Sequence, residues 1–243
     1  MVSNPDLQWR HLSLEEQFAM RTEARVIDLS RTEQGTYAAP DTTRVIRNTY
    51  QLLALSTAVA GVGAGISMLA DFGPLAGIVF TLLGLVPLFY LHKKRNTAAA
   101  VPAMLTFTAL SGLGLGPTLS HYINMPGGSG TVLTAAVITT AVTLALTAYV
   151  QRTGKDFSRM GGFLFAGLIV VILASIAAMF VPAMQVGVSA VAALLFSGFI
   201  LYDTSRLVRG EEDNYVMAAV SMYLNVLNLF LSVLQLLGFS STD

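Results

Sequence analysis

The chain has 243 residues, of which 54% are hydrophobic and 12% are charged, with 14 Lys and Arg against 14 Asp and Glu. Soluble domains carry about 25% charged residues, so the composition excludes an ordinary water-soluble globule and indicates that lipid surrounds most of the surface. A net charge of zero gives no reason to expect a nucleic-acid partner, and a chain without cysteine excludes disulfides, thiolate metal sites and a cysteine nucleophile.

Residues 1–48 are predicted to be a cytoplasmic N-terminal tail, because they hold six Arg and seven Asp or Glu. The start of the chain is polar and mixed in sign, which differs from a cleavable signal peptide. Within the tail we predict a short amphipathic helix from Ser13, with Glu16 as its capping-box partner, to about Leu29, followed by a linker. Two interpretations of this helix stay open: a tether that lies near the lipid headgroups, or a handle for a cytoplasmic partner.

Seven later stretches are long and apolar enough to cross a membrane, which takes about 20 predominantly apolar residues. Short polar or turn-forming segments separate them. We therefore predict an all-α integral membrane protein in which residues 49–243 form a bundle of seven transmembrane helices. The predicted spans cover approximately residues 49–70, 74–91, 98–119, 131–150, 161–181, 185–207 and 215–237.

The positions of Lys and Arg predict the orientation of these spans. All of them lie in the tail or in the segments that follow the second, fourth and sixth spans. Positively charged loops stay cytoplasmic, so the N-terminus is expected inside and the C-terminus outside. A model with six or eight spans would lose this agreement.

Asp203 is the ionisable residue that lies clearly inside a predicted span, about 6 Å from the cytoplasmic end of the sixth at 1.5 Å per residue. Ionisable groups at such positions usually face the bundle interior and mark a functional path. Arg206 lies one helical turn away, so a local ion pair at the membrane interface is the alternative.

Polar residues of the seventh span recur at steps of four, three, four and three, which places them on one face of a helix. Such a polar stripe cannot face lipid, so it either forms hydrogen bonds that hold the bundle together or lines a water path. Since a short hairpin joins the last two spans, the start of the stripe lies at the depth of Asp203. We expect a proton-sensitive or cation-sensitive site formed by Asp203, Asn225 and Asn228. The stripe consists of Ser221, Asn225, Asn228, Ser232 and Gln235.

Other motifs predict packing rather than catalysis. Gly61 and Gly65, like the glycines at 112–116, lack the context of a phosphate-binding loop and favour close helix packing. The spans hold no HExxH motif, carboxylate pair or Ser/His/Asp set. We therefore expect no enzyme, catalytic residue, cofactor or resident metal.

The C-terminal stretch GFILYDTSRLVRGEEDNYVMAAVSMYLNVLNLFLSVLQLLG resembles the signature of the Bax inhibitor-1, or transmembrane Bax inhibitor motif, family. TTRVIRNTYQLL, LGLGPTL and LLGFSSTD extend the resemblance over residues 42–243 and to the bacterial YccA branch of that family. The resemblance implies a multi-pass protein of the bacterial inner membrane with the last helix at its centre. It also implies a regulator that binds the membrane-anchored AAA protease FtsH, or its complex, and restrains it.

The calcium-leak members of the family imply an alternative function. In them two aspartates, one in each of the last two spans, share protons and act as a pH-sensitive latch. Asp203 matches the first, whereas Asn225 stands at the second and cannot ionise. A hydrogen bond between the two side chains is still geometrically allowed. The alternative is therefore a calcium or cation leak, with Asp203 as its gate and the polar stripe along its route.

Overall fold

The structure, a computed structural model, describes residues 42–240. The predicted amphipathic helix and linker of the tail lie outside the described residues. Within 42–240 the chain forms seven long helices, and two 3-10 turns, η2 (Ser158–Met160) and η3 (Pro182–Met184), precede the fifth and sixth of these. The helices are α2 (Thr42–Leu69), α3 (Pro74–Lys94), α4 (Ala100–Ile123), α5 (Gly128–Thr153), α6 (Gly161–Ala178), α7 (Gln185–Val208) and α8 (Tyr215–Ser240).

All seven helices are long and apolar enough to cross a membrane, which confirms the predicted number of spans. The clearest difference in bounds is at the first, where α2 begins at Thr42 and includes residues assigned to the tail. Val45 is buried in the core, whereas Arg44 and Arg47 are exposed. An amphipathic helix can continue with one buried apolar residue per turn. The charged residues here made the apolar stretch, and therefore the predicted span, shorter than the helix.

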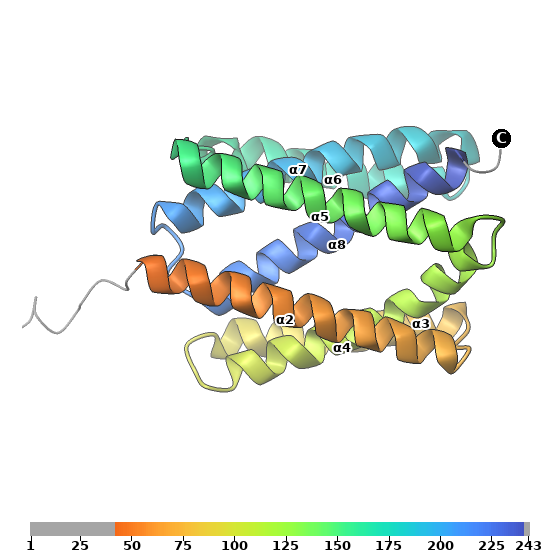
Figure 1. Cartoon of the computed structure of the whole chain (residues 1–243), viewed down its shortest axis with the longest axis horizontal. Coiled ribbons are helices and arrows are strands. Elements are labelled where there is room, and N and C mark those ends of the chain that lie inside the picture. Colours follow the sequence, from red (N-terminus) through yellow and green to blue (C-terminus); the bar gives the residue numbers. More distant parts are fainter. Residues whose placement is uncertain (1–41, 241–243) are drawn as a thin grey trace, which may run out of the picture. The chain divides into compact units, whose positions relative to one another are not determined.

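The last helix connects two groups of three helices (Figure 1). In one group α4 packs against both α2 and α3, and in the other α7 packs against both α5 and α6. Helix α8 packs against α7, α5, α2 and α4, and half of its span is buried, a larger share than in the other six. A helix with protein on several sides can carry polar residues that a lipid-facing helix cannot.

Apolar packing around α8 divides into two clusters. One includes Met104, Phe107 and Met222 and lies on the side of α2 and α4, while the other includes Ile200 and Leu234 and lies on the side of α5 to α7. By contrast, many large apolar side chains of α3 and α6 are exposed. Such outward apolar surfaces fit lipid contact rather than contact with water.

Two glycines allow α2 and α4 to approach closely. A methyl group added to Gly112 would overlap the backbone of Ala60, and one added to Gly63 would lie 2.7 Å from the carbonyl oxygen of Ala109. The packing predicted for the glycines at 112–116 is therefore present. For Gly61 and Gly65 it is wrong within residues 42–240, because a methyl group on either would have none of their atoms within 4 Å outside its own stretch of α2.

The segments that follow α3, α5 and α7 meet at one end of the bundle. The side-chain amide of Asn214, before α8, donates to the carbonyl oxygen of Arg95 and to Oδ1 of Asn96, both at 2.9 Å. Arg209, after α7, pairs with Asp156, after α5, at 3.2 Å. These are the segments that hold Lys and Arg, so positive charge gathers at this end of the bundle, and its cytoplasmic location stays a prediction.

Candidate functional site

The hairpin between α7 and α8 sets the register of the two helices. Gly210, just after α7, has φ +72°, a left-handed conformation that glycine adopts without strain and that ends helices. Asn214 then caps α8, because its Oδ1 accepts hydrogen bonds from the backbone N–H groups of Val216 and Met217, both at 3.0 Å. Two well-defined helix ends thus fix which residues of α7 and α8 face one another.

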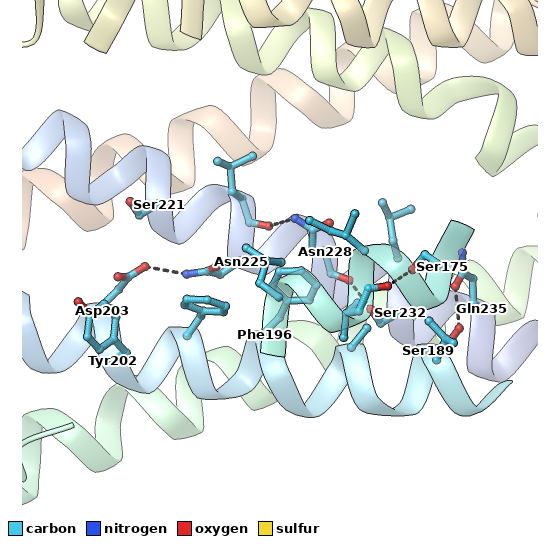
Figure 2. Close-up of a pocket in the computed structure, with 18 of the residues that line it drawn as sticks. Ser175, Ser189, Phe196, Tyr202, Asp203, Ser221, Asn225, Asn228, Ser232 and Gln235 are labelled. Atoms are coloured by element: carbon cyan, nitrogen blue, oxygen red, sulfur yellow. Dashed lines mark hydrogen bonds between the residues drawn. The ribbon is translucent and has the colours of Figure 1, made fainter. Parts of the chain in front are cut away.

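Near the end of this helix pair that is predicted to be cytoplasmic, Asn225 donates a hydrogen bond from Nδ2 to Oδ2 of Asp203 at 2.7 Å (Figure 2). Only 7% of the Asn225 surface is exposed, and Asp203 is partly buried. A distance of 2.7 Å is typical of a charge-assisted hydrogen bond to a carboxylate. The contact that the sequence allowed between these two side chains is therefore present in the structure.

Arg206 makes its ion pairs with the hairpin between α7 and α8, and none within 4.0 Å with Asp203. Its guanidinium lies 3.7 Å from Oε2 of Glu212 and 4.0 Å from Oε2 of Glu211, and it sits over the ring of Tyr202 at 5.6 Å. The two glutamates of the hairpin place two carboxylates beside Arg206, so this cation turns toward them. Asn225 is consequently the polar partner of Asp203.

Farther along the polar stripe, two local hydrogen bonds are followed by a second interhelical one. Asn228 donates to the carbonyl oxygen of Leu224, and Ser232 donates to that of Asn228, both at 2.7 Å and both within α8. At the other end, Ser189 of α7 donates from Oγ to Oε1 of Gln235 at 2.7 Å. Two polar contacts, one near each end of the stripe, thus join α8 to α7.

The stripe also lines a cavity of about 790 Å³ bounded by α6, α7 and α8 (Figure 2). Asp203 lies at one end of it, and Ser175, Ser189 and Gln235 lie toward the other. The wall from α6 is mainly apolar, whereas α8 supplies amide and hydroxyl groups. All five predicted stripe residues line this cavity: Ser221, Asn225, Asn228, Ser232 and Gln235. Both uses considered for the stripe, interhelical bonding and lining a path, therefore have a structural basis.

The atoms of the cavity wall that could bind a cation are mainly oxygens. Asp203 supplies a carboxylate, and the amide and hydroxyl groups of α8 supply neutral oxygens. Calcium binds in proteins through about six to eight oxygen ligands. Within residues 42–240 no group of three or more His, Asp or Glu side chains is placed to hold a metal ion.

A second polar cluster lies between the segments after α5 and α7. The hydroxyl and backbone N–H of Ser158 donate to Oδ1 of Asp156 at 2.6 and 2.8 Å, and these bonds, with Arg209 nearby, hold the pKa of Asp156 below its usual value. A hydrogen bond to Glu211 raises the pKa of Arg209. Ser205 accepts a hydrogen bond from the backbone N–H of Phe157 at 2.9 Å. The cluster fixes this end of α6 to α7.

The sequence did not reveal Ser189, which bonds to Gln235 of the stripe, or Ser175 of α6, which bonds within its own helix and lines the cavity. Ser175 and Ser189 are single hydroxyl residues in apolar segments and carry no periodic signal of their own. The Asp156-x-Ser158 spacing, in contrast, is typical of a turn in which Asp bonds to the backbone two residues on, and could have been recognised.

Fold and site together define a seven-helix membrane protein built around a central helix with a polar face. Residues 42–242 match the family model "Bax1-I: Inhibitor of apoptosis-promoting Bax1". The chain belongs to the Bax inhibitor-1 family.

Several bacterial proteins are similar to the chain over most of its length. An "Uncharacterized membrane protein" of Vibrio cholerae is 42% identical over 206 residues, which cover 84% of this chain and 92% of the relative. The "Modulator of FtsH protease YccA" of Escherichia coli K12 is 39% identical over 206 residues, which cover 83% of this chain and 93% of that protein. A protein of another Escherichia coli strain with the same identity and coverage is called "Inner membrane protein YccA".

Proposed function

We propose that this protein is a regulator in the bacterial inner membrane that binds an FtsH-type protease, or a complex containing it, and restrains its proteolysis. The observation that carries the proposal is the 39% identity to the Escherichia coli modulator of FtsH over 93% of that protein's length. Identity at this level over a whole bundle supports a shared partner, and the relative called an inner membrane protein supports the same location. We propose no catalytic step for this chain.

The physical basis we propose is competition by a substrate that is hard to extract. Forty-one residues precede α2 and provide a segment that the protease can engage. Pulling on them loads α2, which is packed closely against α4 at Gly112 and lies beside the start of α8, where Thr49 donates to the carbonyl oxygen of Tyr215 at 3.4 Å. Extraction must therefore break helix contacts at the centre of the bundle, and the engaged protease is unavailable to other substrates.

Deleting residues 1–40 tests the part of the tail. The experiment follows turnover of a membrane substrate of FtsH in Escherichia coli that lacks its own YccA, with the full chain, the shortened chain or neither. We expect the full chain to slow turnover and the shortened chain to have little effect. Equal restraint by both would remove the tail from the mechanism, and no restraint by the full chain would refute the proposed function.

A matched variant tests the part of the bundle. Gly112→Leu keeps the tail but forces α2 away from α4, because even a methyl group there overlaps the backbone of Ala60. We expect this chain to be extracted and degraded faster than the wild type, and to restrain the protease less. A variant that is visibly less stable yet restrains the protease fully would contradict resistance to extraction as the basis of the effect.

A passive cation leak is the second candidate, and the observation that favours it is the cavity along the polar stripe with Asp203 at one end. The test compares wild type, Asp203→Asn and Asn225→Asp in liposomes loaded with a calcium dye, between about pH 6 and 8. We expect a leak to change with Asp203→Asn and to become more pH-dependent with Asn225→Asp, which restores a coupled carboxylate pair. No flux from any of the three would exclude this function.

A further inference from the structure

Two glycines in the middle of α2 make no contact with the described part of the bundle that would require glycine. Gly61 and Gly65 are separated by one helical turn, and glycine is a poor helix former compared with alanine. A methyl group on either would have no other part of the described bundle within 4 Å. Gly63, between them, differs, because it packs against Ala109 of α4. A reason for Gly61 and Gly65 must therefore be sought outside the bundle.

These glycines belong to a row of small residues on the outer side of α2. Spacings of four, three and four residues place Ala54, Ala58, Gly61 and Gly65 on one face, and all four are exposed or partly exposed. Small residues at such spacing let two transmembrane helices bring their backbones together. We call these four residues the α2 stripe.

A cavity of about 250 Å³ adjoins the α2 stripe and contains a buried hydroxyl group without a partner. Residues of α2, α4, α5 and α8 line it, and Gly61 stands at its edge; in Figure 1, α8 passes behind the space between α2 and α5. Thr139 lines the cavity and is 3% exposed, yet its hydroxyl has no hydrogen-bond partner among the residues that the structure describes. The adjacent Thr140 differs, since it donates to the carbonyl oxygen of Ala136 at 2.8 Å.

We propose that the α2 stripe and this cavity form the docking surface for a transmembrane helix of the protease, an inference that rests on the proposed function. A side chain of a helix that packs closely on the stripe can enter the adjoining cavity, where it can accept a hydrogen bond from the Thr139 hydroxyl. The segment that precedes α2 is the reason for choosing the protease as the partner. Its 41 residues end where α2 begins, so a protease that holds them keeps its own membrane helix at high local concentration beside α2.

The test measures how much FtsH the tagged full chain retains from gently solubilised Escherichia coli membranes, detected with an antibody to FtsH. We expect Gly61→Leu and Gly65→Leu to reduce retention about tenfold, because the added side chains separate the two helices. The matched control is Gly162→Leu on α6, where an added group likewise meets no other part of the protein. It should retain FtsH like the wild type.

Thr139→Val tests the hydrogen bond separately and should reduce retention about threefold, the effect of one average interhelical hydrogen bond in a membrane. Thr140→Val is its control and should have no effect, because the Thr140 hydroxyl is already bonded within α5. A photoreactive residue at Ala58 should cross-link to a transmembrane segment of FtsH. Thermal unfolding of each purified variant checks that the bundle is intact.

Three results would overturn the inference, and they differ from failure of the proposed function. If the wild type retains FtsH and the glycine variants retain it equally, the docking surface lies elsewhere. If the cross-link at position 58 joins two copies of this chain, the α2 stripe serves self-association instead. If the control Gly162→Leu reduces FtsH retention as strongly, the loss is a general effect of adding leucine to the outside of the bundle and not an effect at the α2 stripe. If the wild type retains no FtsH at all, the proposed function fails and this inference fails with it.

Discussion

Removing the side-chain amide of Asn225 should destabilise the bundle more than removing the same group from Asn228. The two residues share a type and a helix face and lie one turn apart. Asn225 donates to Asp203 on the neighbouring helix, whereas Asn228 donates to the carbonyl oxygen of Leu224 in its own helix. Asn225→Ala therefore breaks a contact between α7 and α8 and leaves a partly buried carboxylate without its donor, while Asn228→Ala breaks a local bond.

The expected difference in stability follows from the group to which each amide donates its hydrogen bond. Hydrogen bonds to charged groups contribute about 1.5 to 3 kcal/mol in soluble proteins, and interhelical hydrogen bonds in membranes average about 0.6 with a maximum near 1.7 kcal/mol. The Asp203 contact is short and its amide is 7% exposed, so we place Asn225→Ala at about 1.5 kcal/mol. For a chain of this size, that lowers Tm by about 3 to 6 °C. Asn228→Ala should lower it by about 2 °C at most.

The assay is thermal unfolding of the purified protein in one detergent, for the two alanine variants, Asp203→Asn, and the double variant with Asn225→Ala. If the hydrogen bond carries the effect, the double variant loses less stability than the sum of its parts. Equal losses from the two alanine variants, or strict additivity in the double variant, would refute the assignment of Asn225 as the contact that holds α8 to α7.

Three further predictions concern other parts of the bundle. Gly112→Ala should destabilise it by about 1 to 3 kcal/mol in thermal unfolding, since its methyl group overlaps backbone, whereas Gly61→Ala should leave Tm unchanged or higher. Ser189→Ala should lower the free energy of unfolding by less than about 1 kcal/mol, because its partner Gln235 is exposed. The pKa of Asp156 is lowered, so its stabilisation is complete above the ordinary value of about 4 and is lost as pH falls through the lowered one. The protection of the segment after α5 against hydrogen exchange, measured relative to the intrinsic exchange rate at each pH, should therefore be constant from pH 7 to about 5 and decrease only in stronger acid, and Asp156→Asn should abolish that decrease.

Periodicity explains why the sequence predicted so much of the site. Ser221 through Gln235 follow the spacing of one helix face, and helical geometry alone then requires these side chains to point the same way. The partner of Asp203 was harder to predict, because Arg206 and Asn225 were both within reach. Two glutamates of the hairpin decide between them by pairing with Arg206, and such a choice depends on tertiary contacts that no spacing in the sequence encodes.

The glycines show the same limit of prediction from sequence, because their contacts also depend on the tertiary structure. The sequence assigned one use, close packing, to Gly61, Gly65 and the glycines at 112–116. Those of α4 do face a neighbouring helix, whereas Gly61 and Gly65 face outward. Because α2 is apolar around much of its circumference, its composition does not distinguish the side that meets protein from the side that meets lipid.

Asn225 stands where the resemblance to calcium-leak members implies a carboxylate, and this amide bears on the choice between the two candidate functions. A pair of carboxylates holds together only while it shares a proton, so its contact opens and closes with pH. The amide of Asn225 donates to Asp203 at any physiological pH and needs no shared proton. A leak gated at Asp203 would have to break this bond before a cation could bind there, whereas resistance to extraction is strengthened by keeping it. A fixed donor at this position therefore favours a permanently fastened bundle, which is what the proposed regulator requires.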